Sequence, residues 1–473
     1  MILWVFMHFH ISTTGRGTDT MNIIIVGCGK IGTTILSSLL AEGHDIVAVD
    51  SNPDVISEIS NIYDSMYVCG SGTDCDTLSE AGVEHAELFV AMTGSDELNM
   101  LSCFIAKKMG AKHTIARIRN PEYNYKSLGF LRQQLDLSTS INPDLLAAEE
   151  LFQVLKLPSA VKVEYFSHRN FELLELRLKE DSPLCGVQLS ALRKKYEAKF
   201  LICVVQRGEE VYIPDGSFQL QAGDRIALTA APSEVQKLLK MMGILQKQAR
   251  NVMILGASRM GYYLARMLLA SGTNVKIIDR DHQRCQEISE KLPSAVVICG
   301  DGAQQELLLE EGIGSMDAFI SLTGMDEENI LISFFASSQG VKKVISKVNR
   351  DELRFIAEKL GLDTLISSRL VSSNVLSRYA RALQNSLGSN VETLYKLMDG
   401  RAEALEFRVQ ADFPMTNVPL KDMRLKSGIL IAGVIRNRKT IIPSGVDVIL
   451  PGDRVIVLSA ASGMHDLSDV LMQ

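Results

Sequence analysis

The sequence Ile23-Ile-Ile-Val-Gly27-Cys-Gly29-Lys-Ile-Gly32 decides how the first part of this 473-residue chain folds. It is a short apolar run that ends in the pattern G-x-G-x-x-G. A helix-like stretch follows, and a second apolar run then ends at Asp50. Asp50 lies 18 residues after Gly32, about where the ribose-binding acid of a dinucleotide-binding βαβ unit stands. This order of strand, glycine turn, helix, strand and acid predicts a nucleotide-binding unit of the Rossmann type.

Each glycine of the motif has a separate physical role in such a unit. Gly27 allows the tight turn, Gly29 lets a pyrophosphate approach the backbone, and Gly32 lets the helix lie close to the sheet. The free N–H groups and the positive dipole end of the helix would then hold the phosphates. We therefore expect nucleotide binding here, and the alternative is a Rossmann-like scaffold without a ligand.

Composition excludes several other classes of protein. The chain is 46% apolar and 22% charged, which is ordinary for globular domains. A net charge of −7 and the absence of a long basic run argue against nucleic-acid binding. The eight cysteines include no C-x-x-C pair, and the eight histidines do not cluster at metal-ligand spacing. We expect reduced thiols in a cytosolic protein and no metal site.

Residues 1–20 differ from the rest of the chain. Their apolar run is too short to span a bilayer and lacks the features of a signal peptide. Met21 stands immediately before the first expected strand, as an initiator would. We expect a disordered leader or a misassigned start. No later apolar run approaches ~18 residues, which predicts a soluble chain.

The chain repeats itself after about 229 residues. Five features recur in register at spacings of 229 or 230, which indicates a tandem duplication. The matched positions are Gly27 and Gly256, Asp50 and Asp279, Gly70 and Gly300, Thr93 and Thr323, and Gly216 and Gly445.

Each repeat predicts two domains. Apolar strand-like runs first alternate with helical stretches, which is typical of a doubly wound α/β domain with a parallel sheet. Short strands separated by turn signals then predict a small α+β domain. The expected order is Rossmann domain 21–141, linker or crossover helix 142–162, small domain 163–243, Rossmann domain 250–367, linker or crossover helix 368–390 and small domain 391–473. The amphipathic helices at 143–157 and 369–384 could pack on their own domain, but we favour a partner domain.

Three further motifs point to one family. Thr93-x-x-Asp-Glu-x-Asn99 follows the fourth strand, Ala116-Arg-Ile-Arg-Asn-Pro-Glu122 follows the fifth, and the small domain contains I-P-x-G and G-D-R. This combination resembles RCK (KTN) domains. Two copies in one chain resemble the TrkA family, the cytosolic regulatory subunits of Trk-type potassium uptake systems.

The resemblance implies a function and a set of partners. Such a subunit is cytoplasmic and lies at the inner face of the cell membrane, bound to an integral membrane potassium-translocating subunit of the TrkH/TrkG type. A homotetramer would supply a ring of eight Rossmann domains. Binding of NAD(H), and of ATP or ADP, would change the shape of the ring and gate potassium uptake.

We expect nucleotide contacts at corresponding positions of both repeats. Asp50 and Asp279 would accept hydrogen bonds from ribose hydroxyls, and no arginine follows Asp50 to favour NADP. Arg117 would meet a phosphate, with Lys347 as its counterpart. Three polar residues at the start of the following helix are read equally well as helix caps or as ligand contacts in each repeat, namely Asp96, Glu97 and Asn99, and Asp326, Glu327 and Asn329. The predicted site residues are Gly27, Cys28, Gly29, Lys30, Ile31, Gly32, Asp50, Thr93, Gly94 and Arg117 in the first repeat, and Gly256, Ala257, Ser258, Arg259, Met260, Gly261, Asp279 and Thr323 in the second.

The repeats are not expected to be equivalent. Ser258 replaces the middle glycine, and Asp301 stands where the first repeat has Ser71. We therefore predict tighter binding in the first repeat and a second site that is weaker or tuned to a different nucleotide. The alternative is that the second Rossmann domain is only a scaffold for the ring.

The competing class is an NAD-dependent oxidoreductase, which needs a proton donor near the nicotinamide. The small domains offer only His168 and His465, at unrelated positions of the two repeats. We expect a regulatory protein without catalytic residues. A regulator of another cation transporter or antiporter is the remaining alternative.

Overall fold

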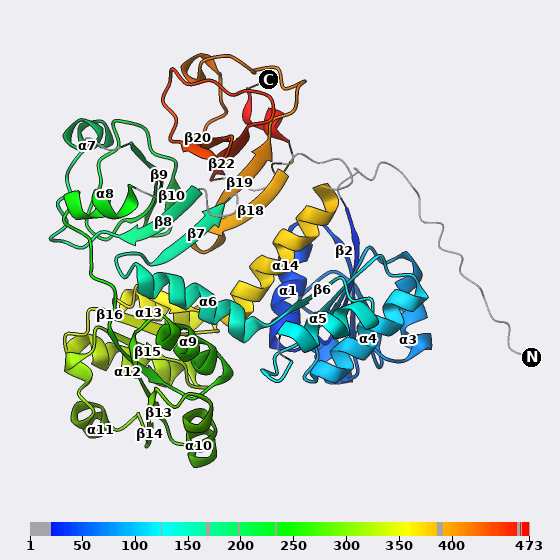
Figure 1. Ribbon diagram of the computed structural model, residues 1–473. Helices are drawn as coiled ribbons and strands as arrows, with labels where there is room; N and C mark the ends of the chain where they lie inside the picture. The colour runs from blue at the N-terminus through cyan, green and yellow to red at the C-terminus, as the bar shows by residue number, and fades with distance from the viewer. Residues whose placement is uncertain are drawn as a thin grey trace, which may run out of the picture. The chain divides into compact units, whose positions relative to one another are not determined.

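The computed structural model describes residues 20–472, except 124, 167–170, 197–198, 232–233, 386–390, 461–463 and 465 (Figure 1). Residues 1–19 of the expected leader, and both His168 and His465, lie outside the described residues. No helix in the described part of the chain is long and apolar enough to cross a membrane. Two compact units are distinguished. The first comprises residues up to Arg117 and Asn124–Ser140, and the second comprises Ile118–Tyr123 and everything from Ile141 onward.

The first Rossmann domain is built on a six-stranded sheet of order β3-β2-β1-β4-β5-β6. The central strand β1 pairs in parallel with β2 and β4, so that Ile24 lies between Val47 and Phe89. The chain reverses its direction of sheet growth between β1 and β4, which is where ligands bind in open α/β sheets. The strands are β1 (Asn22–Val26), β2 (Asp45–Asp50), β3 (Met66–Cys69), β4 (Leu88–Ala91), β5 (His113–Arg117) and β6 (Thr139–Ile141).

Helices connect these strands. They are α1 (Lys30–Ala41), α2 (Pro53–Ser60), α3 (Cys75–Glu80), η1 (Val83–His85), α4 (Asp96–Met109) and α5 (Tyr125–Gln134). The central strands are apolar along their whole length because helices cover both faces of a doubly wound sheet. All four residues of β4 are buried.

The second Rossmann domain repeats this topology in the order β14-β13-β12-β15-β16-β17. Ile254 of β12 lies between Ile277 and Ile320, as Ile24 does between its neighbours. Its strands are β12 (Asn251–Leu255), β13 (Asn274–Asp279), β14 (Val296–Cys299), β15 (Ala318–Ser321), β16 (Lys343–Lys347) and β17 (Thr364–Ile366). Its helices are α9 (Arg259–Ala270), α10 (His282–Lys291), α11 (Gln305–Glu310), η3 (Ile313–Ser315), α12 (Asp326–Ser338) and α13 (Asp351–Lys359).

Each Rossmann domain is followed by a five-stranded antiparallel sheet. The first sheet contains β7 (Lys162–Phe166), β8 (Phe171–Arg177), β9 (Phe200–Arg207), β10 (Glu210–Tyr212) and β11 (Arg225–Ala230), with α7 (Leu189–Lys195) and α8 (Val235–Met241). The second contains β18 (Val391–Leu397), β19 (Ala402–Arg408), β20 (Ile429–Arg436), β21 (Lys439–Ile441) and β22 (Arg454–Ser459), with η4 (Met398–Gly400), η5 (Leu420–Asp422) and η6 (Leu467–Val470). The predicted fold class, a tandem of Rossmann and small α+β domains, is confirmed.

The two small domains pack against each other through a shared apolar core. The Phe166 and Tyr395 rings lie 4.1 Å apart, and Phe166 meets Phe171 edge to face. Gly433 faces the Phe171 ring so closely that a Cβ there would lie 2.3 Å from Cε2. Each sheet therefore buries one face against its counterpart in the same chain.

Helix α6 (Pro143–Lys156) buries its apolar face against α9 of the second Rossmann domain. Ala148, Leu151 and Leu155 join the core that contains Tyr263 and Leu264. The Nδ2 of Asn142, which caps α6, donates to the Tyr263 hydroxyl at 3.1 Å. Helix α14 (Ser368–Asn385), its counterpart in the second repeat, contacts α6 and β18.

Candidate nucleotide-binding site

Two of the three glycines in the first motif are required by packing alone. Gly27 has φ +88°, and a Cβ there would lie 2.6 Å from the Thr93 nitrogen. A Cβ on Gly32 would lie 2.0 Å from the Gly27 oxygen. Gly29 differs, because its φ is −67° and a Cβ would meet nothing within 4 Å. Only the middle position therefore opens onto space that a ligand could occupy.

The second motif keeps the two packing glycines. Gly256 has φ +104°, with Leu322 backbone atoms 2.9 Å from an added Cβ. Gly261 would bring its Cβ within 2.6 Å of the Gly256 oxygen. The turn has the same construction in both repeats, and the middle residue is what distinguishes them.

That middle residue also caps the following helix. Gly29 is the N-cap of α1 and makes no side-chain capping bond. Ser258 is the N-cap of α9, and its Oγ accepts the Gly261 N–H at 3.2 Å. In α9 one N–H of the first turn is therefore already hydrogen-bonded to the Ser258 side chain. In α1 the N-cap is a glycine, which has no side chain to accept such a bond. The sequence placed Ser258 at the phosphate approach but did not reveal this bond.

The two predicted ribose acids fasten the glycine turn to the second strand. Asp50 accepts the Cys28 N–H at 2.8 Å and the Asn52 N–H at 2.9 Å. Asp279 accepts the Ala257 N–H at 2.6 Å and the Asp281 N–H at 2.9 Å. A carboxylate offers about four acceptor positions, so each acid retains capacity for ribose hydroxyls.

Cys28 contributes to the core through its side chain. The thiol is buried and lies 3.7 Å from the Val49 carbonyl oxygen. Burial raises the pKa of Cys28 to about 12, and the nearby Asp50 carboxylate adds to this effect. The thiol is therefore protonated and unreactive at neutral pH. Any ligand contact of this residue has to come from its backbone.

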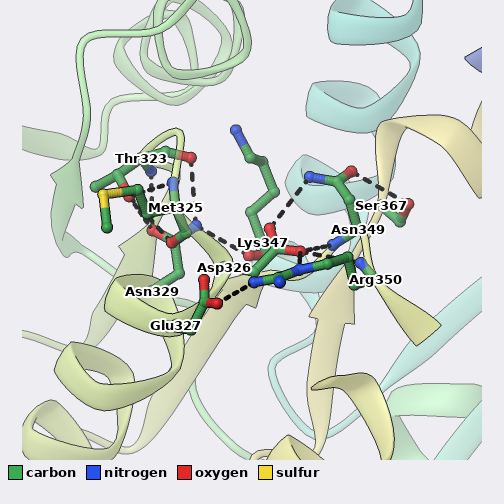
Figure 2. A network of polar contacts seen from close by, with 9 residues as sticks. All are labelled: Thr323, Met325, Asp326, Glu327, Asn329, Lys347, Asn349, Arg350 and Ser367. Carbon is green, nitrogen blue, oxygen red and sulfur yellow. Dashed lines mark hydrogen bonds and ion pairs between the residues drawn. The ribbon is translucent and has the colours of Figure 1, made fainter. Parts of the chain in front are cut away.

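Buried asparagines shape the loop after the fourth strand in each domain. Asn99 accepts both the N–H and the hydroxyl of Thr93 at 2.8 Å, and it donates to the Arg117 carbonyl at 2.9 Å. Asn329 makes the same three bonds with Thr323 and Lys347 (Figure 2). These asparagines are neither helix caps nor free for a ligand, because their side chains tie neighbouring strand ends together.

Asp326 has a comparable structural role. Its Oδ2 accepts the backbone N–H groups of Asn349 and Arg350, both at 2.9 Å (Figure 2). The Arg350 guanidinium also pairs with Asp326 and with Glu327. The carboxylate thereby fixes the loop that follows β16. We expected Asp326 to be a helix cap or a ligand contact, and this bonding to the loop after β16 is neither.

Two cations lie at the carboxyl end of the fifth strand, as predicted. Arg117 is mostly buried, and its guanidinium donates to the Thr93 carbonyl oxygen. The Lys347 Nζ lies 3.4 Å from the Leu322 carbonyl oxygen. Burial lowers the pKa of Lys347, whereas Asp144 and Asp326 favour its charged form. An anion beside Lys347 would stabilise that charged form further.

The second Rossmann domain has a cleft of about 220 Å³ at this edge. Four predicted residues line it, namely Gly256, Ser258, Asp279 and Thr323. Asp301 and Lys347, the expected counterparts of Ser71 and Arg117, line it as well. The cleft is also lined by residues that were not predicted, namely Gly324, Arg280, Arg284 and Glu328. Arg280 directly follows the ribose acid, and this position was the signal that could have identified it. Ala257, Arg259, Met260 and Gly261 are not among the lining residues, and the Met260 side chain is in the core.

The described part of the chain contains no cluster of side chains that could bind a metal ion. No group of three or more histidine, cysteine, aspartate or glutamate side chains among those residues could hold a metal ion. The polar groups at the cleft are instead backbone N–H groups, hydroxyls, carboxylates and cations, which suit ribose and phosphate.

Comparison with known proteins gives matches along nearly the whole chain. The TrkA-N domain model matches residues 23–134 and 252–368, and the TrkA-C domain model matches 173–243 and 404–472. A "Trk system potassium uptake protein TrkA homolog" from Archaeoglobus fulgidus is 31% identical over 450 residues, which is 95% of this chain and 100% of the relative.

Solved structures share the fold. A GsuK channel bound to NAD has a TM-score of 0.61 at 19% identity, covering 96% of this chain and 79% of that one. GsuK bound to ADP has a TM-score of 0.50 at 17% identity, covering 78% of this chain and 71% of that one.

The family follows from two observations. The TrkA-N and TrkA-C models each match twice along the chain, and a relative above 30% identity matches over its full length. The chain belongs to the TrkA family of Trk potassium uptake proteins, which are regulatory RCK-domain proteins rather than enzymes.

Proposed function

We propose that this chain is the cytoplasmic, nucleotide-sensing subunit of a Trk-type potassium uptake system. It binds NAD(H), and ATP or ADP, in its Rossmann domains and thereby gates an integral membrane potassium-translocating subunit of the TrkH/TrkG type. Family membership supports this role, and GsuK, which shares the fold, has structures bound to NAD and to ADP.

One local arrangement carries the nucleotide part of the proposal. The open position at Gly29 adjoins a helix N-terminus without a side-chain cap, and Asp50 stands at the next strand with unused acceptor positions. A phosphate needs the helix N-terminus, and a ribose needs the acid. Lys30 and Ile31 directly follow Gly29, and Gly94 directly follows Thr93, whose backbone lies against Gly27. These three predicted residues complete the proposed first site.

We further propose that four chains form a ring of eight Rossmann domains at the inner face of the membrane. The duplication supports this arrangement, since one chain supplies two Rossmann domains and pairs its own small domains. Soluble homo-oligomers usually have closed symmetry, and four copies of a two-Rossmann chain would form such a closed ring.

Two measurements on the purified full-length chain test these proposals. Calorimetry with NADH, NAD, ATP and ADP should give saturable binding without turnover of NADH. Light scattering should give four copies of the chain, in the absence or presence of nucleotide. A monomer at micromolar concentration would exclude the ring.

Reconstitution with the membrane subunit tests gating. The chain should copurify with a potassium-translocating membrane protein, and potassium flux into proteoliposomes should depend on the added nucleotide. Flux that is the same with and without the chain, at saturating nucleotide, would contradict the proposed role even if nucleotide binds.

A further inference from the structure

A second, larger cavity lies in the compact unit that contains the second Rossmann domain. It has a volume of about 580 Å³, well within the range of small-molecule sites. One wall comes from the first small domain, including the end of β8 and the residues after it. The opposite wall comes from the start of β16 and the turn before β17. These are the amino ends of the Rossmann strands, opposite the nucleotide cleft.

Both segments that connect the first small domain to the rest of the chain line the same cavity. Pro158–Val161 joins α6 to β7, and Gly243–Gln246 leads from α8 toward β12. The Ser159 hydroxyl links the two segments, since it donates to the Ile244 carbonyl oxygen and accepts the Gln246 N–H, both at 2.8 Å. A ligand in the cavity would therefore touch the junction that sets the position of one domain against the other.

The charges lining the cavity are mainly positive. Its cationic side chains are Arg177, Lys179, Lys342 and Lys343, and its carboxylates are Asp181 and Asp363. Arg177 and Asp363 neutralise each other in an ion pair of 3.3 Å. Lys179 and Lys342 are exposed and have no ion-pair partner among the described residues.

Lys343 is the unusual member of this set. Its side chain is buried, with a relative exposure of 7%. The ammonium group donates to the Ala160 carbonyl oxygen at 2.7 Å and to the Thr364 hydroxyl at 2.8 Å, so both of these hydrogen-bond partners are neutral. Burial lowers the pKa of Lys343 to about 7; Asp363 opposes this shift and the positive charge of Lys179 adds to it. Nearby negative charge would relieve both the burial cost and the repulsion.

The duplication does not repeat this cluster. In the strand registers, His113 pairs with Leu88 as Lys343 pairs with Ala318. Arg408 pairs with Arg454 as Arg177 pairs with Arg225, which places Gln410 at the position of Lys179. Two of the four cations are thus absent at the matching positions. The cavity therefore has lysines at two positions where the other repeat has a histidine and a glutamine.

We propose that this cavity is an effector site for a small phosphate-bearing anion. Lys179, Lys342 and Lys343 supply its positive charge, and the two interdomain connections close around the ligand. This site is separate from the nucleotide clefts and does not depend on their proposed function.

Inorganic pyrophosphate is a suitable probe, with sulfate at equal ionic strength as the control for screening. Hydrogen–deuterium exchange on the full-length chain should show pyrophosphate-dependent protection of 158–161 and 243–246. Protection confined to 256–261, or equal protection by sulfate, would overturn the proposal.

Substitutions at the mouth of the cavity test the same point without disturbing the core. The double variant Lys179→Gln/Lys342→Gln removes two exposed charges and should weaken pyrophosphate binding about tenfold or more. Lys291→Gln removes an exposed charge from α10 of the same domain and should bind like the unchanged protein. Equal affinity in the double variant and the control would refute the site.

Proton uptake gives an independent readout. At pH 7 a group of pKa about 7 is half protonated, so anion binding should draw up to about half a proton per site onto Lys343. Calorimetry in two buffers of different ionisation enthalpy measures the net proton exchange, to which pyrophosphate itself contributes near neutral pH. Lys343→Met should remove the part that Lys343 takes up, and the same net exchange in this variant and in the unchanged protein would remove Lys343 from the site.

Discussion

An exchange of the two helix N-cap residues should redistribute nucleotide affinity between the Rossmann domains. In Gly29→Ser, the new hydroxyl can accept the Gly32 N–H, as Ser258 accepts the Gly261 N–H in the second repeat. The helix would then lose a donor for phosphate. A hydrogen bond to a charged group contributes about 1.5–3 kcal/mol, so affinity at the first site should fall about ten- to a hundredfold.

The structure indicates that this change will not disturb folding. Gly29 has φ −67°, and an added Cβ meets nothing within 4 Å. Serine is a somewhat better N-cap than glycine, by a few tenths of a kcal/mol. The variant should therefore melt at the same temperature as the unchanged protein or slightly above it. Binding is lost without a loss of stability, which separates this variant from a merely misfolded one.

Calorimetry of the full-length variants with NADH and ADP measures the effect. Ser258→Gly should raise affinity at the second site by a similar factor, since it frees the Gly261 N–H. Gly129→Ser, an identical substitution at an exposed position in α5 with no atom within 4 Å of the new Cβ, is the matched control. If Gly29→Ser binds both nucleotides as tightly as this control, the argument from the N-cap donor is wrong.

Three other substitutions test separate parts of the structure. Asp50→Ala should weaken nucleotide binding and lower Tm, because the part-buried Cys28 N–H loses its acceptor at about 1–3 kcal/mol, whereas water can replace the acceptor of the exposed Asn52 N–H; calorimetry and thermal melting check both effects. Lys343→Met should stabilise the fold by a few kcal/mol at pH 6.5. Because the pKa of Lys343 is lowered to about 7, the charged lysine destabilises the folded protein fully below about pH 7. Between pH 7 and 10 the unfolded state binds more protons than the folded state, so this destabilisation declines. The stability gained by Lys343→Met, measured by denaturant titration, should therefore be smaller at pH 9.5. Gly433→Val should destabilise the pairing of the small domains by about 1–3 kcal/mol through its clash with Phe171, seen as a lower Tm, and an unchanged Tm would show that the ring moves freely.

The sequence predicted the fold because its signals were local and repeated. Gly27 and Gly32 have a steric requirement that any Rossmann turn shares, and the duplication doubled each observation. The same locality explains why Gly256, Ser258, Asp279 and Thr323 were predicted and also line the observed cleft. Strand ends at one edge of a parallel sheet must converge, whatever their side chains.

Other features depended on contacts that sequence spacing does not encode. From the sequence, Asn329 could be a helix cap or a ligand contact. In the structure its side chain instead bonds to Thr323 and Lys347 and so connects two strand ends. Lys343 is an ordinary lysine in sequence, and it is buried because the segment before β7 covers it. The sequence likewise does not show which element each amphipathic helix and each small sheet packs against, because this depends on the shapes of the surfaces that meet in the folded chain.

The two proposed sites of the second Rossmann domain are joined by a single strand. Strand β16 begins with Lys343 at the junction cavity and ends with Lys347 at the nucleotide cleft, a span of about 13 Å at ~3.3 Å per residue. It is paired on both sides, with β15 and β17, so a shift at one end moves a rigid element. If the strand couples the sites, ADP must change the affinity for pyrophosphate by the same factor that pyrophosphate changes the affinity for ADP. Independent affinities in both directions would show two sites on one strand without communication, and a factor that vanishes in Lys179→Gln/Lys342→Gln would assign the coupling to the junction cavity.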